Sequence, residues 1–407
     1  MKDSLQAFSS SIAGLLASRA VLEGVGVGDS TASPTSALLL SILQESMGRI
    51  ATILFAHRLG TSLEPECKMY RLAADVFNDC AMLMDCLSPA FPKPARVMLL
   101  SFSSCLRALC GVCAGSAKAS LSAHFAKKGN LGELNAKDSS QETVLSLLGM
   151  LAGSVVVSWV TTPMATWATL IALLSIHLGT NYAAVKAVSM NSLNRQRANI
   201  VFGHMLSYEH SGVEILSPKE VSEQERIFER DGVLRVGDVV FGYGRIGVSM
   251  QTLLVCINAA IPTESGALAT MPVKVADLLN LFASEGYILW VNNNLQPDVG
   301  SKEVLIVLKK DCTALDQLKA WMHALLLVHE ADHRDLTAPP KAEKSNAETQ
   351  LNKLNTTLEL RRHLFDQHIP VLESKGWNLD VAALETRAGV RALIPIQKKQ
   401  SVNIATT

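Results

Sequence analysis

The chain carries the stretch TVLSLLGMLAGSVVVSWVTTPMATWATLIALLSIHLGTNYAAV at residues 143–185, and this stretch decides the class of fold. It holds two segments without Asp, Glu, Lys or Arg, 20 residues at 143–162 and 22 residues at 164–185, with Pro163 between them. A helix rises about 1.5 Å per residue, so each segment can cross a hydrocarbon core about 30 Å thick. The stretch therefore predicts a helical hairpin in a membrane; the alternative is a buried hairpin in a soluble protein.

The charges beside this hairpin predict its orientation. Basic residues flank both of its outer ends: Lys118, Lys127, Lys128 and Lys137 before it, and Lys186, Arg195 and Arg197 after it. The tip around Pro163 is uncharged. Because cytosolic loops of membrane proteins are enriched in Lys and Arg, we expect both outer ends to face the cytosol or its topological equivalent.

The composition agrees with a membrane protein. Charged residues make up 18% of the 407 residues, whereas a typical soluble domain has about 25%. Lys plus Arg and Asp plus Glu are equal at 37 each, which argues against a general nucleic-acid-binding protein. Six of the eight cysteines lie in apolar segments, so we expect buried thiols, including the CxxC pair Cys110 and Cys113, and no disulfide framework.

Glycine spacing predicts where helices approach one another closely. Gly111 and Gly115 form one GxxxG pair, and Gly149 and Gly153 form another. Such pairs allow helix backbones to come into contact within lipid.

The predicted fold class is mainly α: a polytopic helical membrane domain, then a small α+β domain and a C-terminal helix. Further helices are expected at 34–57, 67–87, 95–117, 275–284, 314–328 and 351–372, strands at 287–291 and 303–309, and a charged loop at 214–232. The expected domains are the helical membrane domain at 1–200, a connector at 201–270, the α+β domain at 271–335, a linker at 336–350, and the C-terminal helix and tail at 351–407.

Two sequence motifs resemble known catalytic or cofactor sites. Residues 242–247 match GxGxxG, but no second strand follows as a dinucleotide-binding fold requires, so we predict a loop there. His329, Glu330 and His333 match the zinc-binding HExxH pattern at the charged end of a helix. A metal-dependent hydrolase is therefore the alternative function.

Ionisable residues on otherwise apolar helices are the candidate binding residues. Arg71, Asp75, Asn78 and Asp79 share one face of the predicted helix at 67–87, and Lys137, Asp138, Gln141 and Glu142 precede the first long apolar segment. Burying a charge costs several kcal/mol unless it is paired, so such groups usually face a protein interior or a polar cavity. Two interpretations stay open: a polar pocket between helices, or pairs that only orient and cap helices, as Ser139 and Glu142 would in a capping box.

Several of these stretches resemble the root UVB sensitive (RUS) protein family. The resemblance lies in LQAF at 5–8, the glycines at 24–28, RLAADVFND at 71–79, NLGELNAKDSSQET at 130–143, NYAAV at 181–185 and LNRQR at 193–197. It covers roughly residues 3–330. The chain differs at Ser139, where the family usually has Gly, and it starts at Met1 inside a region that members usually precede with a Gly-Tyr-Pro-containing stretch.

The resemblance implies a membrane-associated protein linked to ultraviolet-B responses and vitamin B6 homoeostasis, working with a paralogous partner and a pyridoxal-phosphate-dependent aminotransferase. We therefore expect a non-enzymatic integral membrane protein that binds or transports a small polar solute, such as a B6 vitamer or another small anion, or that scaffolds a complex. Its expected partners are the lipid bilayer and a paralogue or a second copy of itself. We expect no nucleic acid, no cofactor and no bound metal, and the organelle stays open.

Overall fold

The computed structural model describes residues 2–25, 33–126, 129–207, 214–258, 261–262, 268–269, 275–292, 302–337, 347–381 and 383–394. The chain divides into two compact units. Unit 1 comprises Met1–Asn194 and Leu216–Glu229, and unit 2 comprises Arg195–Ile215 and Arg230–Thr407. Each is considered by itself. The predicted five-part division of the chain stays a prediction.

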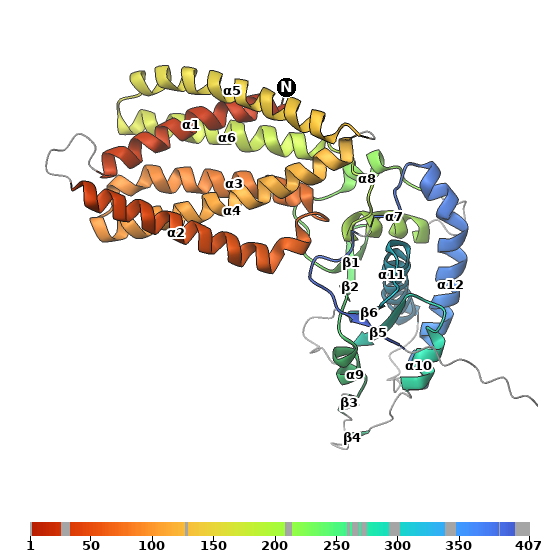
Figure 1. Cartoon of the computed structure of the whole chain (residues 1–407). Coiled ribbons are helices and arrows are strands. Elements are labelled where there is room, and N and C mark those ends of the chain that lie inside the picture. Colours follow the sequence, from red (N-terminus) through yellow and green to blue (C-terminus); the bar gives the residue numbers. More distant parts are fainter. Residues whose placement is uncertain are drawn as a thin grey trace, which may run out of the picture. The chain divides into compact units, whose positions relative to one another are not determined.

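Unit 1 is a bundle of six long helices, in which successive helices run in opposite directions (Figure 1). The helices are α1 (Lys2–Val25), α2 (Pro34–Leu59), α3 (Cys67–Leu87), α4 (Lys93–Phe125), α5 (Leu131–Trp159) and α6 (Pro163–Lys186), with the short α8 (Pro218–Gln224) beside them. The two apolar segments predicted at 143–162 and 164–185 are confirmed as helices, in α5 and α6, with Pro163 as the first residue of α6. Proline suits this position because it has no N–H to leave unpaired. The two helices run in opposite directions, but both pack mainly on α1, which lies between them, and not on each other (Figure 1).

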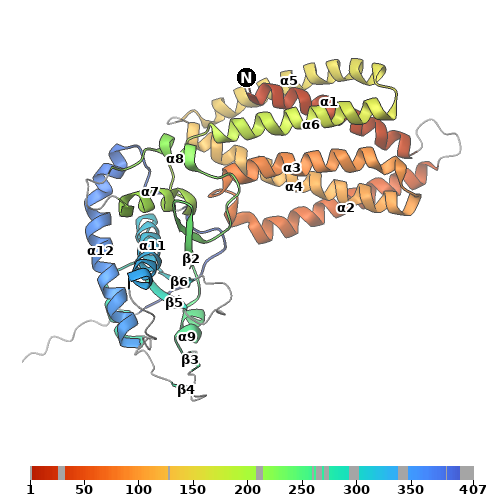
Figure 2. The ribbon, with the colours of Figure 1, turned by 180° about the vertical axis from the view of Figure 1, so that it is seen from behind.

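Five helices of unit 1 are long and apolar enough to cross a membrane by length and composition: α1, α2, α4, α5 and α6. The exception is α3, which lies in the bundle with α1, α4 and α6 packed around it (Figures 1 and 2). Its buried residues include Lys68, Asp75, Asp79 and Asp85. The most polar of the six helices is therefore the one that its neighbours enclose.

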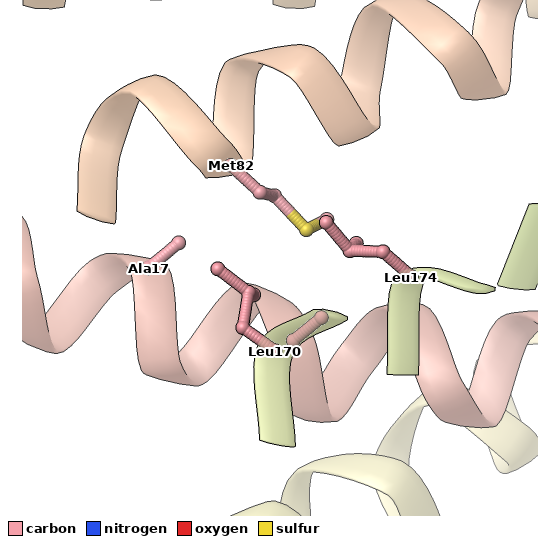
Figure 3. Packing of buried hydrophobic residues seen from close by; sticks show 5 residues of the cluster. Ala17, Met82, Leu170 and Leu174 are labelled. Atoms are coloured by element: carbon pink, nitrogen blue, oxygen red, sulfur yellow. The ribbon is translucent and has the colours of Figure 1, made fainter. Parts of the chain in front are cut away.

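An apolar layer joins α1, α3 and α6. Ala13 and Ala17 of α1, Met82 of α3, and Leu170 and Leu174 of α6 form one buried cluster (Figure 3). The small side chains of α1 leave room for Met82 and the two leucines, whose apolar surface is thereby removed from water and lipid alike.

One of the two GxxxG pairs makes the close helix contact that the sequence predicts. A Cβ atom added to Gly149 would lie 2.7 Å from the Cβ of Ser11, and one added to Gly153 would lie 2.6 Å from Cδ1 of Leu15, so α5 rests directly on α1. Gly111 and Gly115 make no such contact with the described residues of this chain, because a Cβ at either would meet no described atom beyond its own helix within 4 Å; for this pair the close contact stays a prediction.

Unit 2 is a small α+β fold. Its main sheet has the strand order β1 (Val233–Val236), β2 (Val239–Ile246), β6 (Lys302–Lys309), β5 (Tyr287–Asn292), with β7 (Arg391–Ala392) pairing with the end of β6. Its helices are α7 (Arg195–Ser207), α9 (Met250–Asn258), α10 (Val275–Leu281), α11 (Ala314–Thr337) and α12 (Ala347–Ser374), and β3 (Ile261–Pro262) pairs with β4 (Leu268–Ala269). The sheet thus begins at Val233, upstream of the predicted limit at 271. Both β5 and β6 are runs of buried apolar residues, as in an ordinary water-soluble core.

The predicted loop at 242–247 is wrong, because most of it belongs to strand β2. A Cβ at Gly242 would lie 2.3 Å from the carbonyl oxygen of Lys302, and one at Gly244 would lie 2.7 Å from the Trp321 ring. Gly247 has φ +77°, a left-handed conformation that favours glycine. These glycines therefore serve strand packing and the turn that follows.

Two further expectations change with the structure. Ser139 is no N-cap, because α5 already begins at Leu131 and Ser139 lies within it. The charged segment at 214–232 is not all loop: Ser217 and Glu220 form a capping box that starts α8. Of the predicted linker, residues 338–346 lie outside the described residues.

Candidate functional site

A buried polar cluster lies where α1, α3 and α6 meet. Asp75 and Asp79 stand one turn apart on α3, so both point to the same side of the helix, and Arg71 stands one turn before them. Both carboxylates are buried, and Arg71 is half-buried with its side chain 25% exposed. Helix α1 adds Gln6, and α6 adds His177.

Asp75 is held from three helices. Its Oδ2 accepts a hydrogen bond of 2.9 Å from Nε2 of Gln6 and another from the side-chain amide of Asn181. Its Oδ1 lies 3.6 Å from the guanidinium of Arg71. Arg71 in turn donates to Oε1 of Gln6 at 3.2 Å. This carboxylate is therefore fully paired within the bundle.

Asp79 has fewer partners. Its Oδ1 lies 2.8 Å from Nδ1 of His177, but the two groups are not aligned as a hydrogen bond. This is a close contact and not a hydrogen bond, since the separation is short while the angle is poor. Its Oδ2 has no hydrogen-bond partner among the residues that the structure describes.

Gln6 connects the two carboxylates through His177. The imidazole Nε2 lies 3.2 Å from Nε2 of Gln6 and 3.8 Å from Oδ2 of Asp75. His177 is the only residue within 143–185 that can carry a positive charge, and Asn181 follows it at i+4 on the same face of α6. That spacing was the signal for these two residues. Gln6 has no such signal in its local sequence. None of His177, Asn181 and Gln6 was among the eight predicted binding residues.

The eight predicted residues separate into two groups. Arg71, Asp75 and Asp79 share the buried cluster, and Asn78 beside them reaches Oγ of Ser10 at 3.5 Å. The other four, Lys137, Asp138, Gln141 and Glu142, lie on the exposed start of α5.

Ion pairs fix the charged residues at the start of α5, away from the buried cluster. Lys118 of α4 contacts Asp138 at 2.8 Å and Glu142 at 2.9 Å, and Lys137 pairs with Glu133 at 2.5 Å. This second group has the geometry of solvated pairs that join the starts and ends of neighbouring helices.

The HExxH motif does not assemble a metal site in the described part of unit 2. His329 packs edge-on against Phe241, with ring centroids 5.3 Å apart, and the side chain of His333 lies outside the described residues. Among the described residues, no group of three or more His, Cys, Asp and Glu side chains is arranged to hold a metal ion.

Comparison with known proteins places the two units in context. Residues 1–209 match the family model described as "Vitamin B6 photo-protection and homoeostasis domain", and residues 268–387 match "Root UVB sensitive protein, C-terminal". No solved structure matches the chain.

Curated relatives agree. RUS family member 1 of Dictyostelium discoideum is 41% identical over 228 residues, which cover 55% of this chain and 43% of that protein. Protein root UVB sensitive 3 of Arabidopsis thaliana is 31% identical over 328 residues, covering 80% of this chain and 70% of that protein. Protein root UVB sensitive 2, chloroplastic, also of Arabidopsis thaliana, is 24% identical and covers 79% and 66%. On these matches over both units, the chain belongs to the root UVB sensitive family.

Proposed function

We propose that this chain is an integral membrane protein whose helical unit holds a small polar solute connected with vitamin B6 homoeostasis. The observation that carries the proposal is the buried cluster of Asp75, Asp79, His177 and Arg71 inside an otherwise apolar bundle. Ionisable groups in such surroundings are costly, and in membrane proteins they mark solute or ion pathways.

The outer surface of the bundle supports insertion into a membrane. On α2, Ile53 and Leu54 are 67% and 63% exposed, and on α5 Leu151 is 59% exposed. Only 6% of the apolar window of α2 is buried by the rest of the chain. Soluble monomers rarely expose large contiguous apolar surfaces, whereas lipid accommodates them without cost.

The distribution of basic residues supports one orientation. Because successive helices alternate in direction, the end of α4, the start of α5 and the end of α6 lie at one end of the bundle (Figure 2). Lys118, Lys137 and Lys186 lie there. By the positive-inside tendency this end faces the cytosol or its equivalent, as does the start of α1.

The link to vitamin B6 rests on the description of the matched domain and on the relatives. A solute held by fixed charges between helices is a common arrangement in membrane transporters. The cluster offers a carboxylate, an imidazole and a guanidinium within one buried region, which is the kind of polar lining that such a solute needs.

Two measurements test the proposal. Carbonate extraction of native membranes should leave the full-length chain in the pellet, and a monodisperse chain in the supernatant would contradict insertion. Purified protein in lipid nanodiscs should bind pyridoxine or pyridoxamine in calorimetry, and Asp75→Asn should weaken this binding about tenfold or more, which corresponds to about 1.4 kcal/mol.

The matched control is Asp138→Asn on the exposed start of α5, which should bind as the wild type does. Gel filtration of each variant reports whether it has folded. Unchanged binding by a monodisperse Asp75→Asn variant would remove the cluster from the proposal.

A further inference from the structure

The two carboxylates of the cluster differ in how far their charge is compensated. Asp75 accepts from Gln6 and Asn181 and lies beside Arg71. Asp79 has one close contact, His177 Nδ1, and its Oδ2 has no partner in the described part of the chain although the side chain is only 9% exposed. A buried oxygen of this kind costs free energy unless something occupies it.

The hydrogen bonds of Gln6 orient its amide group within the cluster. The amide oxygen of Gln6 accepts from Arg71, so its NH₂ group faces Asp75 and Nε2 of His177. An NH₂ group can only donate, so Gln6 supplies donors to Asp75 and to His177 and none to Asp79. The ring nitrogen that faces Asp79 is Nδ1 of His177.

The two carboxylates of the cluster have one permanent cation beside them. Among the described residues, Arg71 is the one Lys or Arg that contacts either carboxylate, and it lies beside Asp75. An unpaired charge inside an apolar bundle is strongly unfavourable. The missing partner is therefore a positive charge that can also donate a hydrogen bond to Oδ2 of Asp79.

We infer that Asp79 is the recognition residue for a cationic group of the solute, a protonated amine or a pyridinium, while Asp75 holds the site together. This rests on the proposed function and names the chemical class of its ligand. A metal ion fits less well, because no group of three His, Cys, Asp and Glu side chains in the described residues is arranged to hold one.

The surroundings of Asp79 differ on its two sides. Met82 follows Asp79 by one turn on α3, Leu174 precedes His177 by one turn on α6, and both belong to the apolar layer of Figure 3. On the opposite side of the cluster stands Arg71, which is partly exposed. Asp79 is thus the carboxylate next to the apolar layer, and Arg71 marks the partly exposed side of the cluster.

The first test needs no ligand. Asp79→Asn removes an uncompensated charge, so the thermal unfolding midpoint of the nanodisc protein should rise by about 2–4 °C, whereas Asp75→Asn removes a paired one and should lower it by a similar amount. The two substitutions make the same chemical change at positions one turn apart on the same helix, so each variant is the control for the other. A fall in both midpoints would overturn the inference.

The second test compares two probes of nearly equal shape. Pyridoxamine carries a protonated amine where pyridoxine carries a hydroxyl group. The wild type should bind pyridoxamine at least about tenfold more tightly, a difference of about 1.4 kcal/mol, and Asp79→Asn should abolish the preference. Equal binding of both probes by the wild type would overturn the inference and leave the proposed function standing.

A third probe shows whether a negative binding result contradicts the cation site or only the vitamin B6 solute. Ammonium chloride, compared with sodium chloride at equal ionic strength, should raise the unfolding midpoint of the wild type but not of Asp79→Asn. If neither vitamer binds while this ammonium effect and the contrast between the variants persist, the cation site stands and the vitamin B6 solute is wrong. If ammonium has no effect and neither vitamer binds, both proposals fail.

Discussion

Helices α3 and α5 lie in the same bundle and reverse the arrangement that is usual in soluble proteins, in which charged side chains lie outside and apolar side chains inside. Helix α3 carries Lys68, Asp75, Asp79 and Asp85, and all four are buried. Helix α5 is apolar from Thr143 to its end, yet Gly149 and Gly153 are its only fully buried residues. Charges inside and aliphatic side chains outside are what lipid as the surrounding medium favours, because lipid competes for apolar contacts and cannot solvate ions.

Unit 2 keeps the usual order, with apolar strands inside. β5 and β6 are buried over nearly their whole length. On α12, Glu359 lies at the surface, whereas Arg361 is buried and paired with Glu285 at 2.6 Å. The two units therefore differ in where their apolar residues lie, outside on α5 and inside in the sheet. The following changes test that difference, from the largest expected effect to the smallest.

Removing a buried charge from α3 should cause the largest loss of stability. Lys68 and Glu225 form a buried pair at 2.6 Å, with each side chain 5% exposed. Lys68→Met leaves the Glu225 carboxylate without its ammonium partner, so the free energy of unfolding should fall by about 3–5 kcal/mol. Chemical unfolding in detergent measures this.

The matched change on α5 is Lys137→Met, whose partner Glu133 is exposed. It should alter the same free energy by less than about 0.5 kcal/mol. Equal losses in both variants would mean that the two helices do not differ in the way proposed.

Placing a charge on the outside of α5 should affect insertion. Leu151→Arg puts a guanidinium on a surface position midway along the apolar part of α5, which should disfavour membrane insertion by about 2.5–3.5 kcal/mol. Glycosylation mapping of the hairpin in microsomes reports the inserted fraction. Val255→Arg, at an equally exposed position of α9 in unit 2, should leave insertion unchanged.

A buried histidine makes the stability of unit 2 depend on pH. His323 is fully buried between the hydroxyl groups of Tyr287 and Thr357, and burial lowers its pKa to about 3. The unfolded chain takes up a proton below about pH 6.5 and the folded chain does not, so stability falls as the pH drops from about 6.5 toward 3. At pH 5 the loss should be about 2 kcal/mol.

Hydrogen exchange of the α11 amides at pH 7 and pH 5, corrected for intrinsic rates, measures this loss. His323→Gln keeps polar contacts without a titrating ring and should remove most of the pH dependence. A wild-type protein whose α11 protection is the same at both pH values would contradict the assignment.

The smallest effect separates the two GxxxG pairs. Gly149→Ala forces α5 away from Ser11 of α1 and should lower the free energy of unfolding by about 1 kcal/mol. Gly111→Ala meets no neighbour and should change it by less than about 0.5 kcal/mol. Thermal unfolding of both variants in one lipid mixture is sufficient, and equal shifts would contradict the contact between α1 and α5.

The sequence predicted the features that depend on neighbouring residues. The two apolar helices within 143–185 and the face of α3 that carries Asp75 and Asp79 follow from local periodicity and length, whereas the packing of α1 between those two helices does not. The partners of Asp75 do not, because Gln6 lies 69 positions and Asn181 106 positions away. Their meeting depends on how three helices pack, which no local pattern specifies.

The same limit explains the errors at glycines. Gly242 and Gly244 match a cofactor motif only in their spacing, while their actual constraint comes from Lys302 and Trp321, far along the chain. Likewise Asp138 and Glu142 were grouped with Asp75 as polar residues near apolar helices, but Lys118 holds them elsewhere. Residue type was sufficient to find candidates and insufficient to group them.

The position of Gln6 has a practical consequence for anyone who prepares this protein. It lies in the first turns of α1, yet it hydrogen-bonds Asp75 and contacts His177. A deletion of residues 1–6 would remove Gln6 and with it contacts to both Asp75 and His177 in the buried polar cluster.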